Sequence, residues 1–277
     1  MKWIDFDGLF DEKLTQFMEE NKNKYTERQW EDIIPKLYKK FGDTYVAKIK
    51  CTPKEYYAKM SIEELVETLR GHLQNDVPIP EFLCAEVENR DALTVLMPLL
   101  FDKDATLATY AFNLIGDDER AYDSYFKLLE SVDTDEDMQS DIVEVFKYHA
   151  DTIKGRAFNA YANGIAKEYM LEILSRVQEK EERIFDALLS AFNSGENVPM
   201  HASYLAAYGD ERALPILLES IEDTNIGFVE FQELKYAIEA LGGEYKKQRD
   251  FTADKDFLAV EAAISKTSSE EPSGLKS

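Results

Sequence analysis

Hydrophobic and polar positions follow a helical period along most of the chain. In residues 1–75, apolar side chains recur three, four and seven positions apart, a spacing that places them on one face of a helix and predicts three or four helices. They are Leu9, Leu14, Phe17 and Met18 in one stretch, and Trp30, Ile33, Ile34, Leu37 and Phe41 in the next. No alternating run in this part indicates a convincing strand, although Thr44 to Lys50 is too short to exclude one.

Capping residues mark the helix ends in the same part. Thr26 and Thr52 each stand where a hydroxyl would cap a helix N-terminus. Ser61, with Glu64 three residues later, is typical of a capping box, in which each side chain bonds the other residue's backbone amide. Gly42 stands where a C-terminal glycine would end the second helix.

An internal repeat runs through residues 76–244. A shift of 121 positions aligns Val77-Pro78 with Val198-Pro199, and the apolar positions that follow align without a gap. A shift of 29 positions brings in a third copy, and all three place apolar residues at i, i+3, i+4 and i+7. The copies comprise Ala92, Leu93, Leu96, Met97 and Leu100, then Ala121, Tyr122, Tyr125, Phe126 and Leu129, then Ala213, Leu214, Leu217 and Ile221.

The turns before two of these helices also repeat. Gly116 to Ala121 (Gly-Asp-Asp-Glu-Arg-Ala) and Gly209 to Ala213 (Gly-Asp-Glu-Arg-Ala) differ by one Asp. In each, we expect the Gly to end a helix in the left-handed conformation and an Asp to cap the next. With Leu-Met-Pro-Leu-Leu (96–100) and Leu-Pro-Ile-Leu-Leu (214–218), these turns make the segment resemble the HEAT-like repeats in their short bacterial form of about 30 residues. The two prolines fall at different repeat positions, a departure from the family pattern.

The resemblance implies an all-α fold in which helical hairpins stack into an α-α superhelix, a HEAT-like solenoid, with an N-terminal helical cap. We expect the cap at 1–75, a repeat array of five helix pairs and a terminal helix at 76–244, and a C-terminal helix with a disordered tail from Lys266 at 245–277. A cap covers the first exposed apolar face of such an array. The family consists mostly of interaction scaffolds but also includes lyase-associated members and DNA glycosylases, so fold alone leaves function open.

Charge and composition narrow the function. The 277 residues contain 32 Lys and Arg against 55 Asp and Glu, and the repeat array carries a net charge of −22 out of −23. Nucleic acid is therefore a poor ligand, because its readers present a basic face. No apolar run approaches the roughly 20 residues that span a bilayer, and Met1 to Asp7 has no signal-like apolar segment. With Cys51 and Cys84 as free thiols, we expect a cytoplasmic protein without a membrane partner.

No catalytic or metal-binding motif stands out. The three histidines, His72, His149 and His201, lack a second ligand at metal-site spacing, so we expect surface or capping roles for them. Cys84 lies among apolar residues and is expected to be a small buried side chain rather than a nucleophile. The sequence therefore predicts no enzyme activity, no metal and no cofactor.

Two acidic stretches imitate known functional loops. Asp5 to Asp11 superficially resembles the nucleophile loop of haloacid-dehalogenase phosphatases, but the buried strand that such a loop follows has no room here, and helix N-capping is expected. Asp133 to Glu144 has acids at five positions of a calcium loop, yet Met138 stands where the loop needs glycine. An acidic loop before a helix explains the same residues. Calcium binding stays open at this point.

The function that we expect is a non-enzymatic protein–protein interaction scaffold with an acidic repeat surface. In such solenoids the second helix of each hairpin usually lines the concave side, and the register gives its outward positions. The expected partner-binding residues are Val95, Ser124, Lys127, Ile216, Glu219 and Asp223, with Pro98, Asp102 and Ser131 at the remaining equivalent positions. An ordinary solvated face also explains these residues.

An acidic surface of this kind favours a basic protein partner by charge complementarity. The alternative is a lyase-like protein or another enzyme accessory that binds a small molecule between the cap and the repeats.

Overall fold

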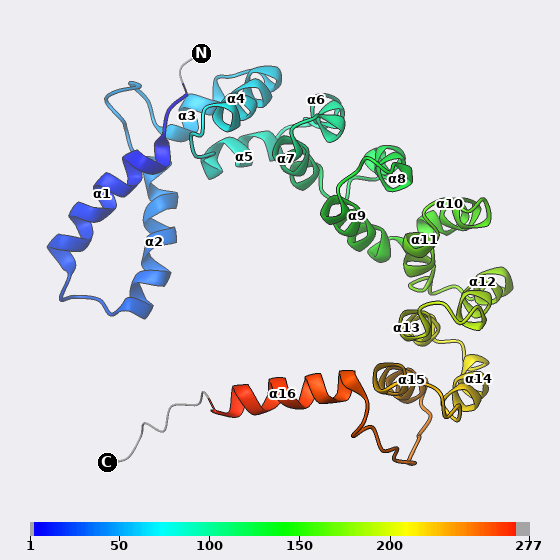
Figure 1. Cartoon of the computed structure of the whole chain (residues 1–277). Helices are drawn as coiled ribbons and strands as arrows, with labels where there is room; N and C mark the ends of the chain where they lie inside the picture. Colours follow the sequence, from blue (N-terminus) through cyan, green and yellow to red (C-terminus); the bar gives the residue numbers. More distant parts are fainter. Residues whose placement is uncertain (1–2, 270–277) are drawn as a thin grey trace, which may run out of the picture. The chain divides into compact units, whose positions relative to one another are not determined.

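The protein is all-helical. The computed structural model describes residues 3–269, and in this range it has sixteen α-helices, two short 3-10 helices and no strand (Figure 1). An isolated antiparallel bridge joins Val46 to Cys51. The chain divides into two compact units, unit 1 up to Met138 and unit 2 from Gln139 onward.

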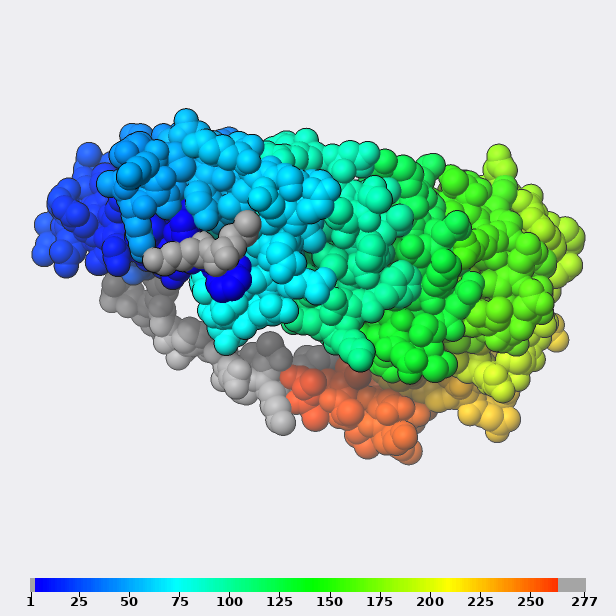
Figure 2. Space-filling view, turned by 90° about the horizontal axis from the view of Figure 1, so that it is seen from above, coloured from blue at the N-terminus to red at the C-terminus, as the bar shows by residue number. Residues whose placement is uncertain are grey.

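Unit 1 begins with a hairpin of two long helices and continues with shorter ones, which Figure 2 shows in chain order from dark blue α1 to green α8. They are α1 (Phe6–Asn21), α2 (Glu27–Phe41), α3 (Pro53–Ala58), α4 (Ile62–Gln74), α5 (Glu81–Glu88), α6 (Leu93–Leu96), η1 (Met97–Phe101), α7 (Ala105–Ile115), η2 (Glu119–Ala121) and α8 (Tyr122–Glu130). The boundary between the units falls within α9 (Glu136–Tyr148).

Unit 2 continues with helices of similar length. They are α10 (Ala150–Ala162), α11 (Lys167–Leu174), α12 (Glu182–Asn193), α13 (Val198–Tyr208), α14 (Ala213–Ser220), α15 (Phe228–Ala240) and α16 (Lys255–Ser269). Residues 76–244 contain eleven α-helices, which taken in chain order make five pairs, from α5–α6 to α13–α14, and a last helix, α15. This is the number of helices that the sequence predicts for the segment.

The predicted capping residues begin the helices of unit 1. Thr26 caps α2, and its hydroxyl accepts a hydrogen bond from the Gln29 amide. At the start of α4 the Ser61 hydroxyl accepts from the Glu64 amide at 3.2 Å, while the Glu64 carboxylate accepts from the Ser61 amide at 2.8 Å. Thr52 begins α3 in the same way. These reciprocal bonds satisfy amides that have no partner within the helix, which confirms the predicted helix starts.

Gly42 ends α2 as predicted, but for a reason that the sequence does not reveal. Its φ of −54° is right-handed, so the backbone does not require glycine there. A Cβ atom at this position would lie 2.5 Å from the ring of Phe82 on α5. Gly71 is similar, since its Cβ would lie 1.8 Å from Nε1 of Trp3. Both glycines therefore allow an aromatic ring to approach the backbone closely.

The three repeat copies bury equivalent side chains. The first position of each copy, the position four residues on and the position eight residues on are all at most 5% exposed. These residues are Ala92, Ala121 and Ala213, then Leu96, Tyr125 and Leu217, then Leu100, Leu129 and Ile221. Burial of one large apolar side chain stabilises a fold by about 1.5–3 kcal/mol. The predicted register therefore describes the core of both units.

The two glycines of the repeated turn differ in conformation. Gly209 has φ 71° and ψ 30°, the left-handed conformation predicted for it. Gly116 also has a positive φ, 60°, but its ψ is −133°, so the prediction of left-handed geometry is wrong there. The turn after Gly116 is one Asp longer, and this extra residue gives the chain another route into the next helix. Only glycine adopts either conformation readily.

An arginine in each repeated turn joins neighbouring hairpins. The Asp118 carboxylate accepts from the Arg120 amide at 2.9 Å, and the guanidinium of Arg120 bonds both oxygens of Asp91 at 3.1 Å, 29 residues earlier. In unit 2, Arg212 reaches Glu182, 30 residues earlier, at 2.8 Å. Helix pairs about 30 residues apart are therefore neighbours within each unit.

Helices of unit 2 lie in two rows. Helices α11, α13 and α15 pack against one another in succession, and Figure 1 shows α10, α12 and α14 in a second row beside them. Helix α16 follows α15 and reaches Ser269. The first residues of the predicted disordered tail, Lys266 to Ser269, thus belong to a helix, and the rest of that tail lies outside the described residues.

Candidate docking groove

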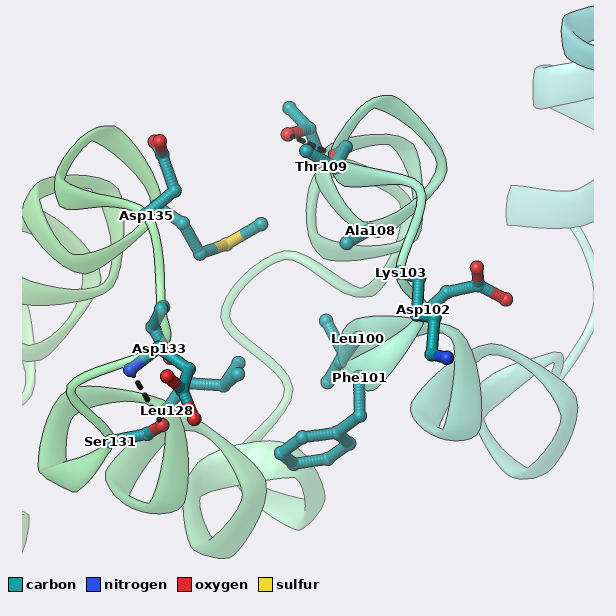
Figure 3. A pocket seen from close by; sticks show the side chains of 13 residues that line it. Leu100, Phe101, Asp102, Lys103, Ala108, Thr109, Leu128, Ser131, Asp133 and Asp135 are labelled. Atoms are coloured by element: carbon teal, nitrogen blue, oxygen red, sulfur yellow. Dashed lines mark hydrogen bonds between the residues drawn. The ribbon is translucent and has the colours of Figure 1, made fainter.

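A groove of about 430 Å³ opens in unit 1 between two neighbouring helix pairs (Figure 3). It lies where η1 and α8 end and where α7 and α9 begin. Its walls come from the end of η1 and the loop after it, from α7, from the end of α8, and from the loop before α9 together with the first turn of α9. In this order the lining residues are Leu100 to Lys103; Ala105, Ala108 and Thr109; Leu128 and Ser131; and Asp133 to Asp135 and Met138. Side chains up to 38 residues apart in sequence therefore meet at one opening. We call this site the docking groove.

The floor of the docking groove is apolar. Leu100, Ala108, Leu128 and Met138 are each at most 7% exposed and line it with their side-chain carbons. Ala108 keeps the α7 side of the groove wide, because a methyl group fills little of the space. Phe101 stands on the wall with 52% of its surface exposed, although aromatic rings are usually buried. An exposed ring beside an apolar floor is a surface that gains free energy when a second apolar group covers it.

Carboxylates surround this floor. Asp102 accepts from the Asp104 amide at 3.1 Å and pairs with Arg70 at 3.4 Å, so its charge is partly satisfied. Asp135 accepts from the amide of Asp137, in the first turn of α9, at 3.0 Å. Within residues 3–269, no Lys or Arg pairs with Asp133 or Asp135. These two exposed carboxylates leave oxygen atoms available to a cation.

Lys103 is the single cation on the groove wall. It is exposed and follows Asp102 in the loop before α7. The three carboxylates of the wall, at positions 102, 133 and 135, outnumber it, so the opening is acidic. Val132, between Ser131 and Asp133, is 97% exposed at its edge. The groove thus combines exposed apolar groups with a net negative charge.

The sequence-predicted partner-binding residues are distributed over both units. Val95 lies on α6, and Ser124 and Lys127 lie on α8. Ile216 and Glu219 lie on α14, and Asp223 follows it. Val95, Ser124 and Ile216 are half-buried, and the other three are exposed.

The structure brings some of these positions together. The Ser124 hydroxyl lies 3.9 Å from the sulfur of Met97, which links α8 to the preceding helix pair. Asp102 and Ser131, which the 29-residue register makes equivalent, both line the docking groove. None of the six expected partner-binding residues lines the docking groove, and of its wall the register includes Asp102 and Ser131 but not Phe101 or Met138. An aromatic residue directly after Leu100 is the one feature of the sequence that could have identified Phe101.

The acidic stretch from Asp133 to Glu144 is a loop followed by a helix. Helix α9 begins at Glu136, so most positions of the supposed calcium loop are helical, as the alternative explanation expects. No group of three or more His, Cys, Asp and Glu side chains that could hold a metal ion occurs in the described part of the chain. Asp5 likewise caps α1, accepting from the Gly8 amide at 2.7 Å.

Two of the three histidines are buried, so the expected surface or capping roles are wrong for them. His72 is fully buried, and its Nδ1 lies 2.7 Å from the carbonyl oxygen of Pro78. His201 is 3% exposed, with Nε2 at 3.1 Å from a Glu168 carboxylate oxygen. His149 is half-buried at the N-terminus of α10. The helical period of apolar residues does not reveal that these two polar rings are buried.

Cys84 is half-buried, so the expectation of a buried side chain is wrong in degree, and its thiol is a poor nucleophile. Burial, together with the nearby charges of Glu88 and Glu81, raises the pKa of its thiol to about 11. A thiol with this pKa is protonated at neutral pH, whereas the thiolate is the reactive form. Cys51 is buried, and both cysteines are free.

No family model, curated protein or solved structure matches this chain. Of the helices formed by residues 3–269, none combines the length and the apolar character needed to cross a membrane.

Proposed function

We propose that the protein is a non-enzymatic interaction scaffold whose docking groove receives a basic segment of a partner protein. The observation that carries this proposal is the apolar floor beside Phe101, flanked by the unpaired carboxylates of Asp133 and Asp135. An inserted apolar side chain would gain about 25 cal/mol for each Å² of apolar surface removed from water. A neighbouring Lys or Arg of the partner would pair with the carboxylates and fix its orientation.

The charge of the chain supports the same kind of partner. The net charge is −23, and residues 76–244 carry −22 of it. Such a field accelerates the approach of a basic protein and repels an acidic one. Exposed acidic residues at Glu219 and Asp223, which the sequence predicts to bind a partner, would contribute to this field. We propose the cytoplasm as the site of action.

A HEAT-like solenoid is the architecture that we propose for this scaffold. Its support is the spacing of neighbouring helix pairs, since Arg120 and Arg212 each reach back about 30 residues to an acid of the preceding pair. Stacked hairpins present successive inter-helix loops along one edge of the array. A groove between two such loops is a natural place for an extended segment of a partner.

The alternative of an enzyme accessory that binds a small molecule beside the cap stays a prediction. Near the predicted cap boundary the polar groups are Asp7, Tyr38 and Tyr57, with the Cys84 thiol nearby. The Tyr38 hydroxyl donates to Asp7 at 2.5 Å, and burial raises the pKa of both phenols well above the ordinary value. These two phenols stay protonated at neutral pH and supply no base or nucleophile.

A synthetic peptide panel tests the proposed function. Each five-residue peptide would carry Trp, Leu or Gly at its centre, flanked on each side by two Lys, two Glu or two Ser. We expect the Lys-flanked peptides with Trp or Leu to bind the full-length protein most tightly, and substitution of the central residue by Gly to abolish binding. Equal binding of Lys-flanked and Glu-flanked peptides would contradict the proposal.

A further inference from the structure

The hairpin of α1 and α2 leaves an apolar stripe partly uncovered. Figure 1 shows the hairpin extending away from α3 and α5 within unit 1, with only its α3-proximal part against them. Phe10 and Phe41 are buried near that end. Further along, Leu14, Phe17 and Leu37 are half-buried, although their spacing places them on the facing sides of the two helices. Most of the stability of a helix comes from covering such a stripe.

This stripe is the floor of a second groove, of about 190 Å³, which we call the hairpin groove. Its charged wall residues are Lys13 on α1 and Lys40 on α2, and none of the residues that line it is acidic. The Lys13 ammonium lies 5.0 Å from the centre of the Phe41 ring. Within the described residues neither lysine pairs with a carboxylate. Lys36, one helical turn before Lys40, extends the basic edge along α2.

We propose that the hairpin groove binds an acidic amphipathic helix of a partner protein. Two antiparallel helices with an apolar stripe between them are completed by a third helix, whose anchors at i, i+3, i+4 and i+7 enter the groove. Its flanking Glu or Asp side chains would pair with Lys13 on one side and Lys40 on the other. A basic helix would place its charges against these lysines and would be rejected.

The docking groove and the hairpin groove, both in unit 1, therefore have opposite charge. The docking groove takes a basic segment, and the hairpin groove takes an acidic helix. A scaffold with both surfaces joins two partners of different charge. The proposal for the hairpin groove rests on residues that do not line the docking groove. It is therefore independent of the function proposed for the docking groove.

Designed helices test this inference on the full-length protein. The probe is a 15-residue peptide with Leu and Phe at i, i+3, i+4 and i+7 and with Glu on both flanks, compared with the same peptide carrying Lys for Glu. Fluorescence anisotropy at 0.15 M salt would measure binding. We expect the acidic helix to bind at least about tenfold more tightly than the basic one, and Lys13→Glu/Lys40→Glu to reverse this preference.

Matched variants separate this surface from the rest of the chain. Lys22→Glu/Lys39→Glu changes the same net charge at exposed positions that do not line the groove, and it should retain the preference for the acidic helix. Asp133→Asn/Asp135→Asn, in the docking groove, should also retain it. Failure of the acidic helix to bind, or equal binding by the Lys13→Glu/Lys40→Glu protein, would overturn the inference. Either result would leave the docking groove untouched.

Discussion

Arg120 bonds both carboxylate oxygens of Asp91 at 3.1 Å, and this bidentate pair joins two successive helix pairs of unit 1. The same guanidinium bonds Asp118 in its own turn. The side chains of Arg120 and Asp91 are largely solvent-exposed and that of Asp118 is half-buried, so water and salt screen much of their interaction. The pair nevertheless shows which helix pairs are neighbours, because the Arg120 guanidinium donates two parallel hydrogen bonds to the Asp91 carboxylate across them.

Stability should depend on pH through this pair. The hydrogen bond from Arg120 lowers the pKa of Asp91 and of Asp118 below the ordinary value near 4. A carboxyl group whose pKa is lowered in the folded state stabilises the protein above about pH 4. This stabilisation is lost as the pH falls through the folded-state pKa. We therefore expect Arg120→Gln to lower the melting temperature at pH 7 and to have a progressively smaller effect towards pH 3. Circular dichroism melts at several pH values would check this, and a difference that stays constant would contradict it.

A pair of glycine substitutions, one at the end of α2 and one within α10, tests how closely other atoms approach the backbone at these two positions. Gly42→Ala would place a methyl group 2.5 Å from the Phe82 ring and should cost about 1–3 kcal/mol through overpacking. Gly155→Ala lies within α10, where a Cβ meets no atom within 4 Å, and should stabilise the protein by about 0.5–1 kcal/mol. Urea unfolding measures both. Opposite signs are expected, and destabilisation by Gly155→Ala would contradict the structure of α10.

Buried tyrosines should resist ionisation. Burial raises the pKa of Tyr57, Tyr125 and Tyr204 far above the ordinary value of about 10, and that of Tyr122 to about 12. Because these tyrosines ionise less readily in the folded state, their stabilising contribution is fully present below about pH 10. It is lost as the pH rises through their folded-state pKa values. At pH 11 the tyrosinate absorbance at 295 nm should be lower in the native protein than in guanidinium. Equal absorbance would show that these rings are accessible.

Cysteine chemistry provides a simple check on unit 1. With a thiol pKa of about 11, Cys84 should react slowly with a disulfide reagent at pH 8 in a Cys51→Ser background. Unfolding the protein in guanidinium should restore the rate of an ordinary thiol. A fast reaction in the native protein would mean that the thiol is neither buried nor held protonated.

The sequence predicts the helical part of this structure well because its signals are local. The capping box at Ser61 and the three equivalent core positions depend on residues three to eight apart, and these interactions survive in any helical fold. The offsets of 29 and 121 positions locate repeated helices because equivalent residues fill equivalent places in the core.

Features that depend on distant neighbours could not be predicted. In the sequence Gly42 is typical of a helix terminator. In the structure the close approach of the Phe82 ring, forty residues away, leaves no room for a side chain at this position. His72 looks polar in sequence but is buried, with the Pro78 carbonyl oxygen as its partner. The docking groove depends on Phe101 and Met138 facing one opening, and no periodicity relates these two residues.

The most direct measurement is the binding of one defined peptide, a Trp flanked by two Lys on each side, to the wild-type protein and to two charge variants. Asp133→Asn/Asp135→Asn removes two carboxylates from the docking groove, and Glu119→Gln/Asp123→Asn removes two from η2 and the start of α8. Calorimetry at 0.05 and 0.3 M salt should show at least about tenfold weaker binding for the first variant at low salt, a smaller effect at high salt, and little change for the second. Equal losses in both variants, or none in either, would contradict a basic segment in the docking groove.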